Sequence, residues 1–126
     1  FLDLAIFSFL TGNNDMHLKN FSMINTGDSW GLAPAYDLLN VAIVNPDDKE
    51  ELALTLEGKK NKLKWEHFES LAKKLELNDK QIKGMAKRFL KNKPLAIQWI
   101  ENSFLSKEFK EKYTQLLEKR YATLFP

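Results

Sequence analysis

The chain opens on an unusually apolar segment. Eight of the ten residues in 1–10 are apolar. A helix that is apolar nearly all round is typically buried centrally in a protein instead of lying on its surface. Gly12 follows almost at once, and glycine is the usual residue for the left-handed conformation that ends a helix. We therefore predict a central, buried helix over residues 1–10.

Two short apolar stretches then flank a turn signal. Residues 21–24 alternate weakly, residues 25–28 read Asn-Thr-Gly-Asp, and residues 30–32 read Trp-Gly-Leu. This pattern predicts a small β-hairpin. Pro34 stops the returning strand because it lacks the N–H that a ladder needs. Residues 52–56, Leu-Ala-Leu-Thr-Leu, also alternate and predict a further short strand.

The second half of the chain carries apolar residues at helical spacing. Helical periodicity first occurs over residues 65–75. Asp79 then predicts an N-cap, Pro94 the first turn of another helix, and Ser106 a further cap. We expect the aromatic residues at these spacings in the core: Trp65, Phe68, Phe89, Trp99, Phe104 and Phe109. His67 falls on a charged helix face, where we expect no role for it.

These elements predict a mainly α fold of the α+β class. Residues 41–126 would supply the strand and the C-terminal helices. The chain begins at Phe1, inside the apolar pattern and without a methionine. We therefore expect it to be part of a longer protein.

Composition narrows the class of protein. The net charge is +2, with 44% apolar and 29% charged residues, which is ordinary globular composition. That charge is too small to indicate nucleic acid or a membrane surface, and the lysines of 59–64 read as a solvated face. The longest apolar run, 4–10, is far shorter than the ~20 residues of a bilayer helix, so no membrane partner is expected. The absence of cysteine excludes disulfides and fits a cytoplasmic location.

The most informative segment is a polar loop between the first helix and the hairpin. Residues 11–22 read Thr-Gly-Asn-Asn-Asp-Met-His-Leu-Lys-Asn-Phe-Ser. Asp15 and Asn20 stand five positions apart, and Asp37 follows beyond the hairpin. By this spacing protein kinases place a base and two magnesium ligands. Residues 1–40 would thus hold the catalytic loop, the hairpin and the metal-binding Asp, with phosphoryl transfer as the leading hypothesis.

Each polar residue has a role in that chemistry. Asp15 would be the base that orients an acceptor hydroxyl. Asn20 and Asp37 offer the hard oxygens that Mg²⁺ prefers, and the hairpin would bring them to one end of a sheet. Lys19 or His17 could stabilise charge on the transferred phosphoryl group.

Other interpretations stay open for the same residues. Asp15 could be a turn residue or a helix cap, and Asp37 the N-cap of a following helix. His17 could be a hydrogen-bonded structural histidine and Lys19 a solvated surface lysine. Tyr36 could serve packing alone.

Two motifs in order resemble one family. Residues 14–22, Asn-Asp-Met-His-Leu-Lys-Asn-Phe-Ser, precede residues 32–39, Leu-Ala-Pro-Ala-Tyr-Asp-Leu-Leu. Both are similar to motifs of the HipA-like kinases, bacterial serine/threonine kinases that are often toxins of toxin–antitoxin modules. Residues 52–59 also resemble the family's strand before its final helices. The resemblance implies the helical C-terminal lobe of a protein-kinase-like fold, with the β-hairpin next to the catalytic loop.

The resemblance also implies roles and partners. Asp15 would be the catalytic aspartate, the run from His17 through Lys19 to Asn20 would contact ATP, and Asn20 would bind Mg²⁺. Tyr36 would neighbour the nucleotide, and Asp37 stands where other kinases have the Asp of Asp-Phe-Gly. Family substrates are proteins that include aminoacyl-tRNA synthetases. The usual partner is a helix-turn-helix antitoxin, through which nucleic acid is contacted only indirectly.

Other parts of a kinase are not found in these residues. The chain has no Gly-rich phosphate loop and no strand-borne lysine, and residues 58–60, Gly-Lys-Lys, lack the glycine spacing of a Walker loop. We therefore expect the 126 residues alone to transfer no phosphate. The competing functions are a non-catalytic helical protein-interaction module or degenerate kinase lobe, and a metal-dependent phosphohydrolase. The latter normally needs more carboxylates or histidines than this loop holds.

Overall fold

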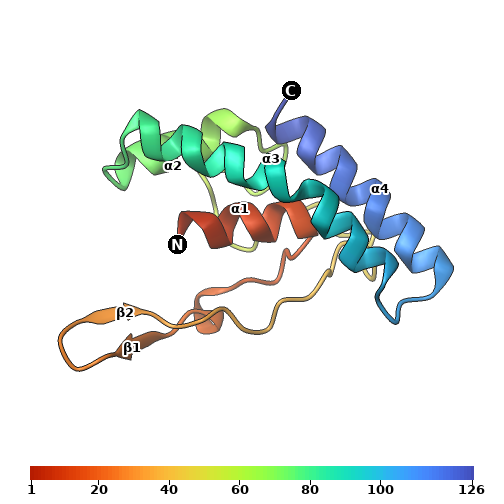
Figure 1. The fold of residues 1–126 in the computed structure, drawn as a ribbon, viewed down its shortest axis with the longest axis horizontal. Helices are drawn as coiled ribbons and strands as arrows, with labels where there is room; N and C mark the ends of the chain where they lie inside the picture. The colour runs from red at the N-terminus through yellow and green to blue at the C-terminus, as the bar shows by residue number, and fades with distance from the viewer.

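The computed structural model describes residues 1–126 as a helical assembly with one projecting hairpin (Figure 1). Its elements, in order, are α1 (Leu2–Thr11), a 3₁₀ turn η1 (Leu18–Asn20), β1 (Met23–Asn25), β2 (Trp30–Leu32), α2 (Trp65–Lys74), α3 (Asp79–Glu101) and α4 (Lys107–Leu124). The predicted mainly α fold with a small hairpin is confirmed.

Helix α1 occupies the centre of this assembly. It packs against α2 and α4, and α3 packs along α4. Four of its apolar residues belong to the main core: Leu2, Ile6, Phe9 and Leu10. The Phe9 ring meets the Phe68 ring of α2 edge-on, with centroids 5.5 Å apart. The expected helix over the first ten residues is thus confirmed as central on its core face, while Phe1 and Phe7 remain exposed.

The hairpin extends away from the helices (Figure 1). Its strands are antiparallel, with Met23 opposite Leu32 and Asn25 opposite Trp30. The side chains of Met23 and Trp30 are exposed, so the hairpin adds little to the core. The hairpin matters because it returns the chain to the polar loop of residues 11–22.

The strand predicted at 52–56 is wrong. These residues form bends and irregular backbone, and the local pairing is one isolated bridge between Leu56 and Lys59. Leu52, Ala53 and Leu56 are nevertheless buried. The apolar residues therefore signalled burial correctly. No partner strand lies alongside, so the segment packs on the helices as an irregular loop.

The cap predicted at Asp79 and the helix start predicted at Pro94 are wrong, although α3 does begin at Asp79. Asn78, not Asp79, caps α3, since its side chain accepts the Gln81 N–H while the Gln81 side chain accepts the Asn78 N–H. Helix α3 then continues through Pro94 to Glu101. The cap at Ser106 is confirmed, because its Oγ accepts the Phe109 N–H.

The aromatic core was overestimated. Phe68 is fully buried and Trp65 and Phe89 pack against the core, but Trp99 is 72% exposed and Phe104 wholly exposed. Phe109 is half-buried. Helical spacing predicts that apolar residues share one face of a helix. Near the α3–α4 turn no neighbouring helix covers that face, so Trp99 and Phe104 stay exposed.

His67 has a role that the sequence did not indicate. It is buried, and its Nδ1 accepts the Lys64 N–H at 2.9 Å, which satisfies a free amide at the start of α2.

Candidate active site

The polar loop begins at a fixed point, Gly12. Its φ of 73° is left-handed, and the next amide, of Asn13, donates to the Ser8 carbonyl at 2.8 Å. The Gly12 carbonyl accepts the Ala42 N–H at 3.1 Å, so the segment after Asp37 lies against the helix end. A Cβ at this position would lie 2.8 Å from the Asn40 Oδ1. The glycine therefore ends α1 and lets residues 40–42 approach the loop.

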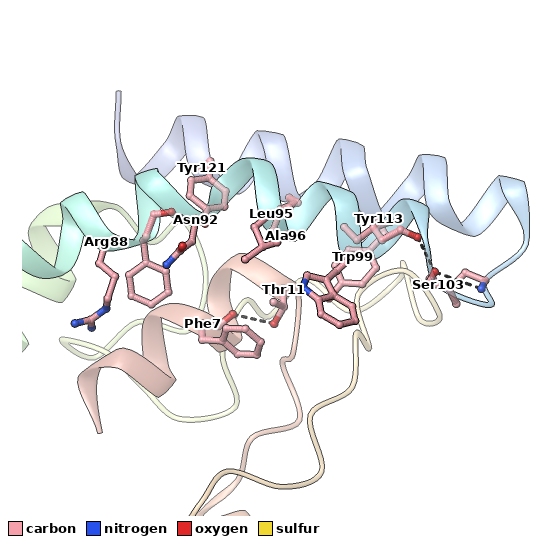
Figure 2. A pocket seen from close by; sticks show the side chains of 14 residues that line it. Phe7, Thr11, Arg88, Asn92, Leu95, Ala96, Trp99, Ser103, Tyr113 and Tyr121 are labelled. Atoms are coloured by element: carbon pink, nitrogen blue, oxygen red, sulfur yellow. Dashed lines mark hydrogen bonds between the residues drawn. The ribbon is translucent and has the colours of Figure 1, made fainter.

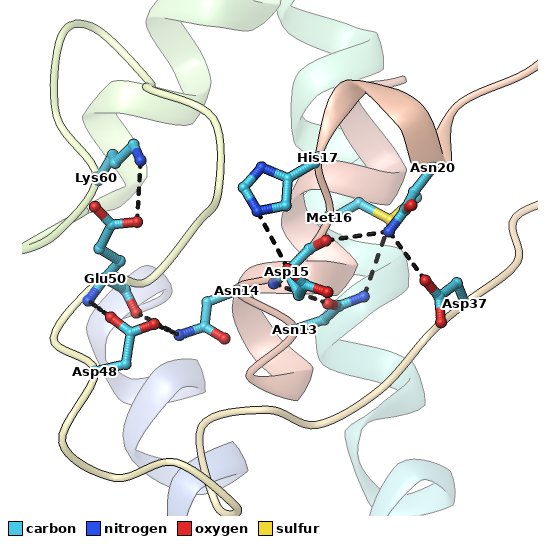
Figure 3. Close-up of polar contacts among 10 residues, drawn as sticks. All are labelled: Asn13, Asn14, Asp15, Met16, His17, Asn20, Asp37, Asp48, Glu50 and Lys60. Carbon is cyan, nitrogen blue, oxygen red and sulfur yellow. Dashed lines mark hydrogen bonds and ion pairs between the residues drawn. The ribbon is translucent and has the colours of Figure 1, made fainter.

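The backbone of Asp15 is held on both sides. Its N–H donates to Asn13 Oδ1 at 3.2 Å, and its carbonyl accepts from Asn20 Nδ2 at 3.1 Å (Figure 3). Asn13 and Asn20 are both buried, whereas the Asp15 side chain is half exposed. The loop thus fixes the main chain while it presents the carboxylate to solvent.

Asn20 and Asp37 meet, as the hairpin predicted. Asn20 Nδ2 donates to Asp37 Oδ2 at 3.2 Å. Asp37 adopts a left-handed φ of 55°, a conformation that aspartate tolerates better than most residues. The chain therefore leaves the hairpin with a turn that directs this carboxylate towards Asn20.

The free oxygens of this pair fit Mg²⁺. Both hydrogen bonds of Asn20 use Nδ2, so its Oδ1 has no partner within the chain, and neither has Oδ1 of Asp37. The structure contains no group of three or more His, Cys, Asp or Glu side chains suited to a metal. Mg²⁺ commonly takes one or two carboxylate-type ligands and completes its shell with water and substrate phosphates. One free carboxamide oxygen and one free carboxylate oxygen, on residues joined by a hydrogen bond, are compatible with that habit.

His17 lies beside the Asp15 carboxylate. Its Nε2 is 3.1 Å from Asp15 Oδ1, and both side chains are about half exposed. His17 therefore pairs with a candidate catalytic group at an exposed position.

Lys19 and Tyr36 flank the same loop. Lys19 is exposed, and its side chain forms no ion pair. The Tyr36 hydroxyl lies 2.7 Å from Ser22 Oγ and donates to the Lys19 carbonyl at 3.1 Å. Tyr36 thus ties the segment before Asp37 to the loop, while the Lys19 ammonium stays in solvent.

The capping alternatives for the two acids are wrong. The Asp15 carboxylate accepts no backbone hydrogen bond, and the 3₁₀ turn that follows has His17 at its cap position. No helix begins at Asp37.

The sequence analysis did not identify four residues near the site: Asn13, Asn14, Asp48 and Glu50. Asn13 and Asn14 are buried in the loop, and Asn14 reaches the segment 45–51, where it contacts Asp48 and Glu50. The signal available in the sequence was the Asn13-Asn14 pair directly before the candidate base.

The largest cavity lies elsewhere. It measures about 560 Å³ and is bounded by α1, α3 and α4, with Phe7, Trp99 and Tyr113 among its mainly apolar lining (Figure 2). None of the six candidate site residues lines it. The candidate site therefore lies outside this cavity.

No helix of the structure is both long and apolar enough to cross a membrane.

A helical lobe that carries an Asp/Asn loop, a hairpin and a returning Asp has the order of elements found in kinase C-terminal lobes. The chain matches the model of the HipA-like C-terminal domain over residues 1–97. It therefore belongs to the HipA-like family.

Individual relatives agree with this assignment. The chain is 37% identical over 84 residues to "Putative kinase Y4dM" of Sinorhizobium fredii (strain NBRC 101917 / NGR234), a match that covers 65% of the chain and 20% of the relative. It is 41% identical over 55 residues to "Putative kinase Y4mE" of the same organism, covering 44% and 13%. The chain thus spans a fifth or less of these curated relatives.

A solved structure shares the fold. It is the complex of the Shewanella oneidensis MR-1 toxin–antitoxin proteins HipA and HipB with their operator DNA. The match has a TM-score of 0.74 and 23% identity, and it covers 98% of this chain and 30% of the solved one. The fold class, a HipA-like C-terminal region, is shown by this match.

Proposed function

We propose that the chain is the C-terminal lobe of an ATP-dependent protein serine/threonine kinase. The observation that carries the proposal is the double hydrogen bond of Asn20, which links the backbone of Asp15 to the carboxylate of Asp37. This one side chain sets the distance between the candidate base and the candidate metal ligands. The proposal also rests on the family and on relatives named as kinases.

Asp15 is assigned the role of the base that acts on the acceptor hydroxyl of the substrate protein. Its exposed carboxylate accepts the hydroxyl proton as the oxygen forms a bond to the γ-phosphorus, the bond from that phosphorus to the bridging oxygen breaks, and ADP leaves. His17, 3.1 Å from Asp15 Oδ1, orients the carboxylate. Lys19 supplies a positive charge near the phosphates, and Tyr36 supports the wall beside the nucleotide.

Asn20 and Asp37 would hold Mg²⁺ through their free oxygens. The ion, when bound, neutralises charge on the nucleotide phosphates. The Asn20 Nδ2 hydrogen bonds leave Oδ1 of Asn20 and Oδ1 of Asp37 without partners in the chain. The chain's contribution would thus be two hard oxygens that are available to the ion.

A protein substrate and an antitoxin are the proposed partners. The solved relative is a complex of HipA with HipB and operator DNA, which supports an antitoxin that also contacts DNA. An aminoacyl-tRNA synthetase is the substrate class that we favour from the family resemblance.

The decisive experiment compares Asp15→Asn with Asp28→Asn in the complete protein. Asp28 lies exposed in the hairpin turn and is the matched control. We expect Asp15→Asn to abolish transfer of the γ-phosphate to protein, and Asp28→Asn to leave it unchanged. Retained transfer in Asp15→Asn would remove Asp15 from the base role.

A second assay separates the kinase from its competitors. Protein phosphorylation should require the complete protein, and the isolated 126 residues should transfer nothing. Measurable turnover by the isolated chain would refute that expectation. Phosphate release without an acceptor protein would favour a hydrolase.

A further inference from the structure

Asn14, the residue before the candidate base, is held by a distant loop. Its Nδ2 donates to Asp48 Oδ2 at 2.9 Å and to the Glu50 carbonyl at 3.2 Å (Figure 3). The side chain is buried, and its Oδ1 has no hydrogen-bond partner. Thus the whole polar anchoring of Asn14 runs through its amide nitrogen to the segment 48–50.

Asp48 uses its two carboxylate oxygens for two different purposes. Oδ1 accepts the Glu50 N–H at 2.9 Å, which closes a turn within its own loop. Oδ2 accepts from Asn14 across 34 positions of sequence. A hydrogen bond to an ionised acceptor is roughly twice as strong as a neutral one. Asp48 is therefore the stronger of the two acceptors on Asn14.

The segment that carries Asp48 is itself fixed to the core. Glu51 Oε2 accepts the Leu63 N–H at 2.8 Å, and Glu51 Oε1 lies 2.8 Å from Arg120 Nη1 of α4. The Arg120 guanidinium also sits over the Phe9 ring of α1, 4.4 Å from its centroid. Asp48 thus connects the catalytic loop to a rigid frame and not to a free loop.

We infer that Asp48 is a positioning residue for phosphoryl transfer, acting on Asp15 through Asn14. The inference rests on the proposed function. Asp48 is exposed and contributes no buried area to the core, so its contacts serve the loop more than the overall fold. It forms no hydrogen bond with Asp15, Asn20 or Asp37, so its effect passes through the Asn14 amide.

The chemical consequence concerns kcat more than nucleotide binding. The bonds from Asn13 and Asn20 still hold the Asp15 backbone when Asp48 is removed. Asn14, the residue before Asp15, however, loses its strongest hydrogen bond, the one to Asp48 Oδ2. A displacement of about 1 Å at a catalytic group can cost on the order of 100-fold in rate.

The test is a double-mutant cycle in the complete protein with saturating ATP and acceptor. We expect Asp48→Ala to lower kcat about ten-fold or more, with the KM for ATP unchanged. Asn14→Ala should lower kcat similarly. The kcat of the double variant should be no lower than that of the slower single variant. Asp48→Asn, which keeps one acceptor oxygen, should recover part of the rate. Asp47→Ala, an exposed neighbouring acid, is the matched control and should keep the wild-type kcat.

Each contrary outcome is distinguishable. A wild-type kcat in Asp48→Ala, with Asp15→Asn inactive, overturns the positioning role and leaves the proposed kinase standing. If the fold-losses in kcat of Asn14→Ala and Asp48→Ala multiply in the double variant, Asp48 does not act through Asn14. A raised KM for ATP at constant kcat shows direct nucleotide contact and also overturns the inference. If Asp15→Asn is active, the proposed function itself fails.

Discussion

Asn20 donates from one nitrogen, Nδ2, to the carbonyl of Asp15 and to the carboxylate of Asp37. Residues at the two ends of a 17-position span are thereby joined at 3.2 Å. The same geometry leaves Oδ1 of Asn20 without a partner. A single buried carboxamide thus serves as a strut between loop and hairpin and as a candidate metal ligand.

Replacement of Asn20 by Asp tests that arrangement. The carboxylate has no N–H, so both hydrogen bonds are lost and two like charges face each other at 3.2 Å. We expect a loss of about 1–3 kcal/mol in the free energy of unfolding in EDTA. Added Mg²⁺ should recover part of it, because a cation separates the two carboxylates. Thermal unfolding with and without Mg²⁺ measures both effects.

Asn61→Asp is the control for that experiment. Asn61 is exposed, and its side chain forms no hydrogen bond, so neither effect is expected there. Equal unfolding temperatures for Asn20→Asp and the wild type in EDTA would contradict the strut.

Gly12→Ala tests the junction between α1 and the loop. The Cβ would lie 2.6 Å from Leu116 Cδ2 and 2.8 Å from Asn40 Oδ1, at a φ of 73°. Left-handed strain and overpacking together should cost about 2–4 kcal/mol. Chemical denaturation measures the loss. Gly84→Ala, inside α3 with open space around it, should instead stabilise by about 0.5–1 kcal/mol. The same sign for both variants would refute this account.

Arg120→Met tests the ion pair behind the 48–51 segment. Burial lowers the pKa of the Arg120 guanidinium and Glu51 opposes that shift, so the arginine stays charged at neutral pH. The pair at 2.8 Å is an ion pair without hydrogen-bond alignment. Its removal leaves the Glu51 carboxylate without a counter-charge. We expect a loss of about 2–4 kcal/mol, below the range for wholly buried pairs because Glu51 is 21% exposed.

Lys73→Met is the matched control for Arg120. It breaks the pair with Glu69, whose members are 59% and 38% exposed, and should change the free energy of unfolding by less than about 1 kcal/mol. Urea unfolding of both variants gives the comparison. A loss at Arg120 no larger than at Lys73 would show that the core frame does not depend on the pair.

The candidate site was predictable because its parts are local. Asp15 and Asn20 share one loop, and a short hairpin returns the chain to Asp37, so spacing alone predicted their proximity. Asp48 was not predictable in this way. It joins Asn14 through one hydrogen bond across 34 positions. No periodicity or turn residue indicates which distant polar loop a buried asparagine will meet.

The core shows the same limit. Periodicity placed Phe68 inside correctly, yet Phe104, on the same type of pattern, is exposed. Whether an apolar face is covered depends on helix lengths and crossing points. For α3 the length itself was misjudged, because Pro94 was interpreted as a beginning when it lies in the interior.

Pro94→Ala therefore tests the continuity of α3. Proline at an interior position leaves the Leu90 carbonyl without its amide donor and crowds it, at a cost of about 3 kcal/mol. Alanine restores the donor, while the freer unfolded chain offsets about 0.4–1 kcal/mol. We expect a net stabilisation of about 2 kcal/mol, measured by denaturant unfolding. Pro46→Ala, in an exposed loop, should show only the unfolded-state effect and be slightly destabilising. A neutral or destabilising Pro94→Ala would contradict the energetic cost assigned to a proline inside α3.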